Sequence, residues 1–210
     1  MPQGGRVNND FGQGFYCTFD REMAREWACG SLSPGAFVNH YALEPSFRLR
    51  TYNLTKKGNI LNWLAVLLKN RRFAITAPIQ AEAKKYILEN FLPDLSPYDI
   101  IIGYRADDSY FSFASDFLGN TISLSQLQGA MRLGKLGEQV FIKSEKAFEA
   151  LTFLSAEPVD RSIYEPRRME RDRRAREDYR KNRTAGDVSG AVYIIDILRE
   201  KWKNDDPRLR

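Results

Sequence analysis

The chain is poor in residues that bind metals or cross-link a fold. Its 210 residues include two cysteines, Cys17 and Cys29, and one histidine, His40. A structural zinc site takes four such ligands, so these three residues cannot complete one unaided. We therefore expect no metal, and we expect both cysteines to be reduced, buried thiols. A disulfide between them is the alternative.

Long hydrophobic runs are also lacking. The longest apolar concentration, Ile60 to Leu68, is interrupted by Asn62 and falls far short of the ~20 residues that cross a bilayer. No charged segment followed by a hydrophobic stretch opens the chain, so we expect no signal peptide. Together these observations predict a cytoplasmic protein without a membrane partner.

The positive charge is concentrated in one stretch of the chain. Residues 161–183 contain ten Lys or Arg and five Asp or Glu, an excess that accounts for the whole net charge of +5. The alternating charges predict a solvated helix with i,i+4 ion pairs. Because one-third of its charges are acidic, this stretch is a weak candidate for nucleic-acid contact. The rest of the chain is near neutral, which argues against a basic groove through its body.

Hydrophobic periodicity predicts interspersed short strands and helices, and therefore an α+β fold. The expected strands are residues 14–18, 36–43, 47–52, 98–104, 139–142 and 151–154. The expected helices are residues 20–29, 59–69, 79–91, one from Asp108, 123–131, one capped by Ser144, and 166–183. A tight turn at Glu44 and Pro45 is expected to join the second and third strands, and residues 151–154 are expected to close the sheet.

The composition predicts three parts. Residues 1–156 form the main domain, residues 157–187 a charged helical linker, and residues 188–210 an amphipathic C-terminal helix. The apolar side of that last helix carries Val192, Ile194, Ile195, Leu198 and Trp202. Such a face must be covered, either by the main domain or by another chain.

The most informative segment lies near the N-terminus. It reads Phe11-Gly12-Gln13-Gly14-Phe15-Tyr16-Cys17-Thr18 and leads into a helix that carries Trp27. A strand that passes directly into a helix can place one aromatic from each element on opposite sides of a flat ring. Glycines permit unusual backbone angles and close approach of a ligand. The segment predicts a clamp for a planar heterocycle; two ordinary core aromatics are the alternative.

This segment resembles the second motif of the ADP-ribosyltransferase fold. In the diphtheria-toxin and poly-ADP-ribose polymerase branch, two tyrosines ten residues apart sandwich the nicotinamide of NAD, and here Trp27 stands at the second position. Further runs are similar to the bacterial domain-of-unknown-function family 3990: residues 6–10, 99–103, 106–110, 133–141 and 144–147. That family is similar to ADP-ribosyltransferases and is suspected to include toxins of toxin–antitoxin pairs. The resemblance covers roughly residues 6–156.

The resemblance implies a split mixed and antiparallel sheet with surrounding helices and a helical C-terminal tail. It also implies NAD as substrate, with Gln139 at the position of the catalytic glutamate, where an amide can orient ribose hydroxyls without supplying charge. Glu138 is adjacent, but strand alternation sends it to the opposite face. The catalytic candidates are Gln139, Glu138 and Tyr16. The candidate NAD-binding residues are Gly14, Phe15, Tyr16, Thr18, Trp27, Arg6, Asn9 and Asp107.

Two of these candidates, Asn9 and Asp107, have roles that the sequence leaves open. Asn8, Asn9 and Asp10 suggest a ligand-facing turn, but ordinary turn chemistry explains them almost as well. Asp107 follows a predicted buried strand, and its role stays open.

The first motif of the resembled fold has no clear counterpart. It is a histidine or arginine on an early strand, and only ten residues precede Phe11. Either that strand is missing, or Arg6 partly substitutes, or NAD chemistry has been lost. The resemblance thus implies an NAD-dependent mono-ADP-ribosyltransferase-like toxin or effector. The alternative is an inactive binding module that docks a protein partner, such as an antitoxin, through its C-terminal helices.

Overall fold

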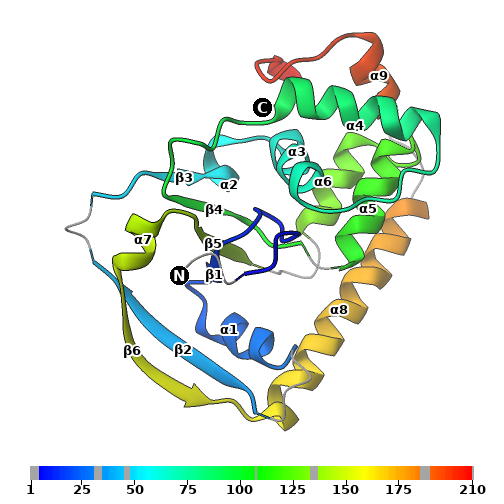
Figure 1. Cartoon of the computed structure of the whole chain (residues 1–210). Helices are drawn as coiled ribbons and strands as arrows, with labels where there is room; N and C mark the ends of the chain where they lie inside the picture. Colours follow the sequence, from blue (N-terminus) through cyan, green and yellow to red (C-terminus); the bar gives the residue numbers. More distant parts are fainter. Residues whose placement is uncertain are drawn as a thin grey trace.

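The computed structural model describes residues 5–30, 35–44, 48–106, 108–132, 137–184 and 190–209. The strands are β1 (Phe15–Cys17), β2 (Phe37–Leu43), β3 (Thr51–Asn53), β4 (Ile100–Tyr104), β5 (Glu138–Ile142) and β6 (Leu151–Pro158). The helices are α1 (Arg21–Ala28), α2 (Leu54–Lys57), α3 (Ile60–Asn70), α4 (Pro78–Phe91), α5 (Asp108–Leu118), α6 (Leu124–Arg132), α7 (Glu145–Glu149), α8 (Arg161–Thr184), α9 (Ile194–Arg199) and a 3-10 helix (Pro207–Leu209). The predicted α+β class is confirmed (Figure 1).

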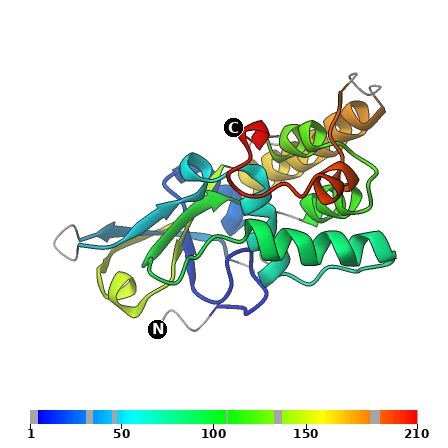
Figure 2. The same ribbon diagram turned by 90° about the horizontal axis from the view of Figure 1, so that it is seen from above.

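The strands form two separate sheets. Four of them pair in the order β1-β5-β4-β3, with β3 and β4 parallel and the other pairs antiparallel. β2 and β6 pair antiparallel in a second sheet, whose register shifts between His40 and Tyr41. Figure 2 shows helices α4, α5, α6 and α9 gathered at one end of the molecule and the sheets at the other. The sheets are therefore mixed and antiparallel, as expected.

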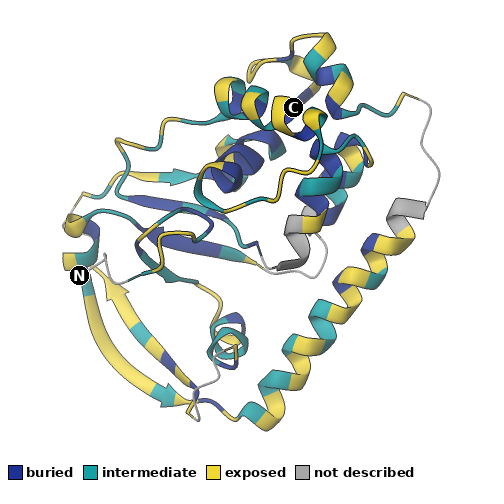
Figure 3. Ribbon diagram, turned by 45° about the vertical axis from the view of Figure 1, so that its right-hand side comes forward, coloured by how far each residue is buried: buried dark blue, intermediate teal, exposed yellow. Residues whose placement is uncertain are grey.

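Two predictions about strand pairing are wrong. Residues 151–154 do not close the main sheet, because β6 pairs with β2 along its whole length and stays largely exposed (Figure 3). The strands on either side of Glu44 do not form a hairpin, because β3 pairs with β4 instead of β2. Pro45, in the expected turn, lies outside the described residues.

Side-chain caps define where several helices begin. Asp20, Asn59 and Ser144 each accept a hydrogen bond from the backbone N–H three residues further along, at 3.0 Å in every case. Ser123 and Gln126 cap α6 reciprocally. Each cap satisfies an N–H that has no partner within its own helix. These helix starts are as predicted from the sequence.

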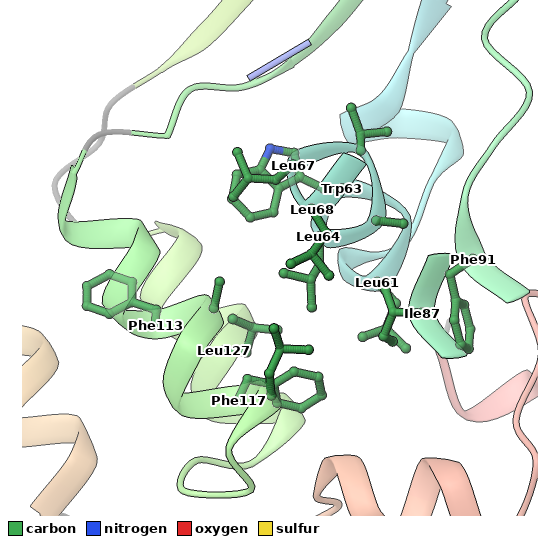
Figure 4. Close-up of a cluster of buried hydrophobic side chains, with 14 of the residues drawn as sticks. Leu61, Trp63, Leu64, Leu67, Leu68, Ile87, Phe91, Phe113, Phe117 and Leu127 are labelled. Atoms are coloured by element: carbon green, nitrogen blue, oxygen red, sulfur yellow. The ribbon is translucent and has the colours of Figure 1, made fainter. Parts of the chain in front are cut away.

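Helix α3 is the centre of the main hydrophobic core. Every side chain from Leu61 to Leu68 is buried, as expected of a helix surrounded by other elements. It packs against α4, and its core cluster includes side chains of the four-stranded sheet, α5 and α6 (Figure 4). The indole of Trp63 donates a hydrogen bond to the carbonyl of Tyr104 at 3.1 Å, which ties the helix to the end of β4.

The C-terminal segment folds back onto this core. Ile194, Ile197, Trp202 and Leu209 are buried in the same cluster as α3, and α9 packs against α4. Ile195 remains 40% exposed. Among the described residues of this segment only Ile194–Arg199 is α-helical, and the core of the chain covers most of the segment's apolar side chains.

Both cysteines are free thiols, Cys29 buried and Cys17 half-buried. Burial raises the pKa of the Cys17 thiol to about 11. None of the helices in the described part of the chain is both long and apolar enough to cross a membrane.

We expect Gly14→Ala to destabilise the protein by about 1–3 kcal/mol. An added Cβ at Gly14 would lie 2.2 Å from Cε2 of Phe141 and 2.8 Å from the carbonyl oxygen of Ile142. Gly129→Ala is the matched control, because an added Cβ there meets nothing within 4 Å. Removing this glycine from α6 should stabilise the protein by about 0.5–1 kcal/mol. Urea denaturation measures both, and equal effects would contradict the packing described here.

Candidate functional site

A cavity of about 560 Å³ lies at one end of the two central strands of the four-stranded sheet, where β4 ends and β5 begins. It is lined by Asn9, Asp10, Tyr16, Trp27, Gly30, Arg71, Arg105, Ala106, Gln139, Arg168, Arg171, Asp172 and Arg176. Its walls thus come from the loop before β1, from α1, from the end of α3 and from α8. Sites for small ligands commonly have volumes of about 300–1,000 Å³.

Tyr16 anchors the N-terminal loop beside this cavity. Its ring packs against Phe141 at a centroid distance of 4.9 Å. Its hydroxyl accepts a hydrogen bond from the N–H of Phe11 at 3.0 Å and donates one to the carbonyl of Gly12 at 2.7 Å. Gly12 has a φ of +96°, a conformation that favours glycine. Burial raises the pKa of Tyr16 far above its ordinary value, so the phenol stays protonated.

Trp27 borders the same cavity from α1. The guanidinium of Arg105 lies over its ring, 4.8 Å from the centroid. The indole Nε1 is buried and has no hydrogen-bond partner among the described residues. Both Tyr16 and Trp27 line the cavity, and none of the ring contacts in the described chain joins one to the other. A flat ligand between them would therefore enter the cavity without separating two stacked rings.

Gln139 points into the cavity from the start of β5. Its Nε2 donates to Asp10 Oδ2 at 2.9 Å and to the carbonyl of Tyr104 at 3.2 Å. Both neighbours present acceptor oxygens to the amide, so its NH₂ group must face them. Gln139 Oε1 accepts no hydrogen bond from the described residues and is the atom left to receive one from a ligand.

Asp10 is a buried carboxylate in the wall of the cavity, only 7% exposed. Its Oδ2 also accepts a hydrogen bond from the N–H of Ala106 at 2.9 Å, and its Oδ1 lies 3.6 Å from Arg71 Nε. Burial raises the pKa of Asp10 above 3.8, against the opposing effects of its hydrogen bonds and of Arg71 and Arg105. The folded protein therefore holds this proton more tightly than an unfolded chain does.

The remaining charge in the cavity is mainly positive. Five arginines line it: Arg71, Arg105, Arg168, Arg171 and Arg176. The structure reports three buried side-chain atoms without a hydrogen-bond partner in the described chain: Trp27 Nε1, Arg168 Nε and Arg171 Nε. All three are donors, and all three residues line this cavity. Five guanidinium groups in one lining make this wall suited to a ligand rich in acceptor oxygens.

Helix α8 brings arginines to the cavity because it is fastened to α1. Arg171 forms an ion pair with Glu26 in which both side chains are mostly buried, and Arg167 forms a second one with Glu22 at 3.3 Å. Figure 1 shows α8 running past the end of α1 towards α5 and α6. Its outer side carries the i,i+4 pairs that the sequence predicts, such as Arg173 with Glu177. The predicted boundary at residue 156 stays a prediction, and the contacts of α8 cross it.

The structure places four of the sequence-predicted site residues in the cavity: Asn9, Tyr16, Trp27 and Gln139. Three other candidates, Gly14, Phe15 and Thr18, do not line the cavity. Gly14 packs under the ring of Phe141, and Phe15 faces the opposite side of the sheet with Phe148. The hydroxyl of Thr18 donates to the backbone carbonyl of Glu138 at 3.1 Å.

Three further candidates are also outside the cavity lining. Glu138 contacts the hydroxyl of Thr55, because adjacent strand residues point to opposite sides. Arg6 is exposed. Asp107 lies outside the described residues. No group of three His, Cys, Asp or Glu side chains within the described ranges could hold a metal ion.

Sequence reasoning missed most of the charged residues of the site. The sequence indicates Asp10 only as part of a ligand-facing or ordinary turn. Arg71 and Arg105 carry no signal because they follow the ends of a helix and a strand. The arginines of α8 were assigned to a solvated linker. Arg168 and Arg171 are three residues apart and face α1, a spacing that the sequence contains but does not distinguish from its neighbours.

Comparison with known proteins identifies a family. The model of the family described as "Protein of unknown function (DUF3990)" matches residues 3–153, and the chain belongs to this family. No curated protein and no solved structure matches the chain.

We expect Asp10→Ala to lower the free energy of unfolding by about 1–3 kcal/mol, because the N–H of Ala106 and the amide of Gln139 lose their acceptor. Asp10→Asn is the matched control, since its carbonyl oxygen can accept from both. Thermal and urea unfolding measure the effect. A loss as large for Asn as for Ala would contradict the prediction.

The same control tests the pKa shift. Because the folded protein binds the Asp10 proton more tightly, the wild type loses stability as the pH rises from 3.8 through the raised pKa of Asp10. The Asn variant lacks this loss, so its stability relative to wild type should increase across that interval and stay constant above it.

Proposed function

We propose that this member of the DUF3990 family binds NAD in the cavity and transfers its ADP-ribose group, with release of nicotinamide. The observation that carries the proposal is the meeting of Tyr16, Trp27 and Gln139 in one cavity with five arginines. The three residues come from β1, α1 and β5. Their roles in the resembled fold are to stack on nicotinamide and to orient the ribose. An NAD-dependent mono-ADP-ribosyltransferase of this kind fits a bacterial toxin or effector.

The ring environment of Trp27 suits nicotinamide. A planar cation, the guanidinium of Arg105, already lies over the indole at 4.8 Å. The nicotinamide ring of NAD⁺ is also planar and positively charged, so the same attraction to the indole face favours it. It leaves as a neutral ring, which weakens that attraction after the bond to ribose breaks.

The arginine wall suits the phosphates of NAD. The diphosphate carries two negative charges and many acceptor oxygens, and guanidinium groups bind such oxygens in pairs. Arg168, Arg171 and Arg176 line the cavity from α8. In this proposal these arginines contact the phosphates. Gln139 Oε1 then accepts a hydrogen bond from a ribose hydroxyl.

The alternative function, a binding module, requires an apolar surface that is mostly buried in the structure. A partner was expected to dock on the apolar face of the C-terminal helix, but Ile194, Ile197 and Trp202 lie in the core of the chain itself. No specific observation favours a binding module over the proposed enzyme. Nucleic-acid contact by α8 is similarly disfavoured, because several of its arginines pair with acids of α1 or of α8 itself.

We expect Trp27→Ala to weaken NAD binding about tenfold or more, because an aromatic stacking partner contributes roughly 1–3 kcal/mol per base. Trp27→Phe keeps a ring at this position and should bind within about threefold of wild type. Calorimetric titration with NAD measures both variants.

The proposed function itself is tested with wild-type protein, labelled NAD and a bacterial lysate. Label should appear on protein or nucleic acid, with release of nicotinamide. Absence of transfer and of nicotinamide release, together with an unchanged melting temperature at millimolar NAD, would refute the proposed function.

Arg168→Ala should reduce NAD affinity about tenfold without changing the weak binding of nicotinamide riboside, which has no phosphate. Arg174→Ala is the control on the same helix: its side chain is 70% exposed and pairs with Glu170. If Arg168→Ala weakened both ligands equally, the arginine would not contact phosphate.

A further inference from the structure

The proposed site lacks a negative charge on β5. Breaking the bond between nicotinamide and ribose builds positive charge on C1′ of the ribose, and a fixed carboxylate stabilises such charge strongly. Gln139, at the start of β5, is an uncharged amide. Glu138 carries a charge, but it contacts Thr55 and does not line the cavity. A carboxylate must come from another segment if the site has one.

Two aspartates line the cavity, and they differ in position. Asp172 belongs to α8 and lies 3.7 Å from Arg171, within the arginine wall. Asp10 belongs to the loop before β1 and accepts a hydrogen bond from the Gln139 amide. Asp10 therefore sits where the ribose is expected, and Asp172 sits with the phosphate-binding groups.

The hydrogen bonds of Asp10 leave one oxygen for a ligand. Oδ2 receives the N–H groups of Ala106 and Gln139, both at 2.9 Å. Oδ1 accepts no hydrogen bond from the described residues; it forms an ion pair with Arg71, whose Nε lies 3.6 Å away. Two donors on one oxygen hold the carboxylate plane still, which is the preorganisation that electrostatic stabilisation requires.

We propose that Asp10 is the catalytic carboxylate of this site and that Gln139 and the Ala106 N–H position it. This inference rests on the proposed function. In the reaction the C1′–N bond breaks and its electron pair goes to the ring nitrogen, which makes nicotinamide neutral. The nucleophile, water or an acceptor group, forms the new bond to C1′, and its proton passes to Asp10 Oδ1 and then to solvent. With water, NAD⁺ yields nicotinamide, ADP-ribose and one proton.

The surroundings of Asp10 fit this role. The charged or titratable groups that face it are Arg71 at the end of α3, Arg105 after β4 and Tyr16 on β1. The two arginines favour the ionised form, while burial raises the pKa of Asp10 above 3.8. A carboxylate with a raised pKa accepts a proton more readily than an ordinary one.

The test compares Asp10→Asn with wild type in the full chain. NAD affinity is measured by calorimetry, and nicotinamide release is measured by chromatography at several pH values. We expect the variant to bind NAD within about threefold of wild type but to release nicotinamide about a hundredfold more slowly. The wild-type rate should rise with pH through the raised pKa of Asp10, and the residual rate of the variant should not. Asp178→Asn, on the exposed side of α8, should behave as wild type.

Each other outcome has a distinct meaning. A folded Asp10→Asn protein that releases nicotinamide within about threefold of the wild-type rate would overturn the role of Asp10 and leave the proposed function intact. Wild-type protein that neither binds nor cleaves NAD would overturn both. If the variant does not fold, the pH dependence of nicotinamide release by the wild type tests the role of Asp10. A rate that is constant from about pH 4 to about pH 8 would overturn the inference, and a rise through this range would support it.

Discussion

The hydrogen bonds that Gln139 and the N–H of Ala106 donate to Asp10 join three distant parts of the chain. They fix the N-terminal loop to the ends of β4 and β5, and the Tyr16 hydroxyl fixes the same loop to its own strand. The cavity forms because these segments meet at one end of the central strands β4 and β5. Burial of the Asp10 carboxylate raises its pKa. Shifted pKa values of this kind are common where a group has a chemical role.

Helix α8 gives the cavity its second wall and most of its charge. Acidic residues of α1 hold it: Glu26 pairs with Arg171 in a mostly buried contact, and Glu22 pairs with Arg167. Arg168, Arg171 and Arg176 of the same helix line the cavity. Some arginines of α8 therefore form ion pairs that hold the helix in place, and others line a face that is suited to an anion.

The sequence predicts local features of this protein well and long-range ones poorly. Caps such as Asp20 and Ser144 and the apolar period of α3 depend on neighbouring residues, so the helices are found where expected. The pairing of β6 with β2 depends on tertiary packing, and its prediction was wrong. In the site, Tyr16, Trp27 and Gln139 could be predicted from the resemblance to a known fold. Asp10 could be predicted only as part of a ligand-facing turn. The arginines of α8 could not be predicted, because only the folded chain shows which charges face the cavity.

The central claim is that NAD lies across this cavity, with its nicotinamide between Tyr16 and Trp27 and its phosphates on α8. The crystal structure of the protein with a carba-NAD analogue, which cannot be cleaved at the ribose, tests this most directly. We predict a flat ring stacked on Trp27, a ribose hydroxyl on Gln139 with C1′ facing Asp10 Oδ1, and the diphosphate against Arg168 and Arg171. Density for the analogue elsewhere on the protein, or no density at a saturating concentration, would contradict this account.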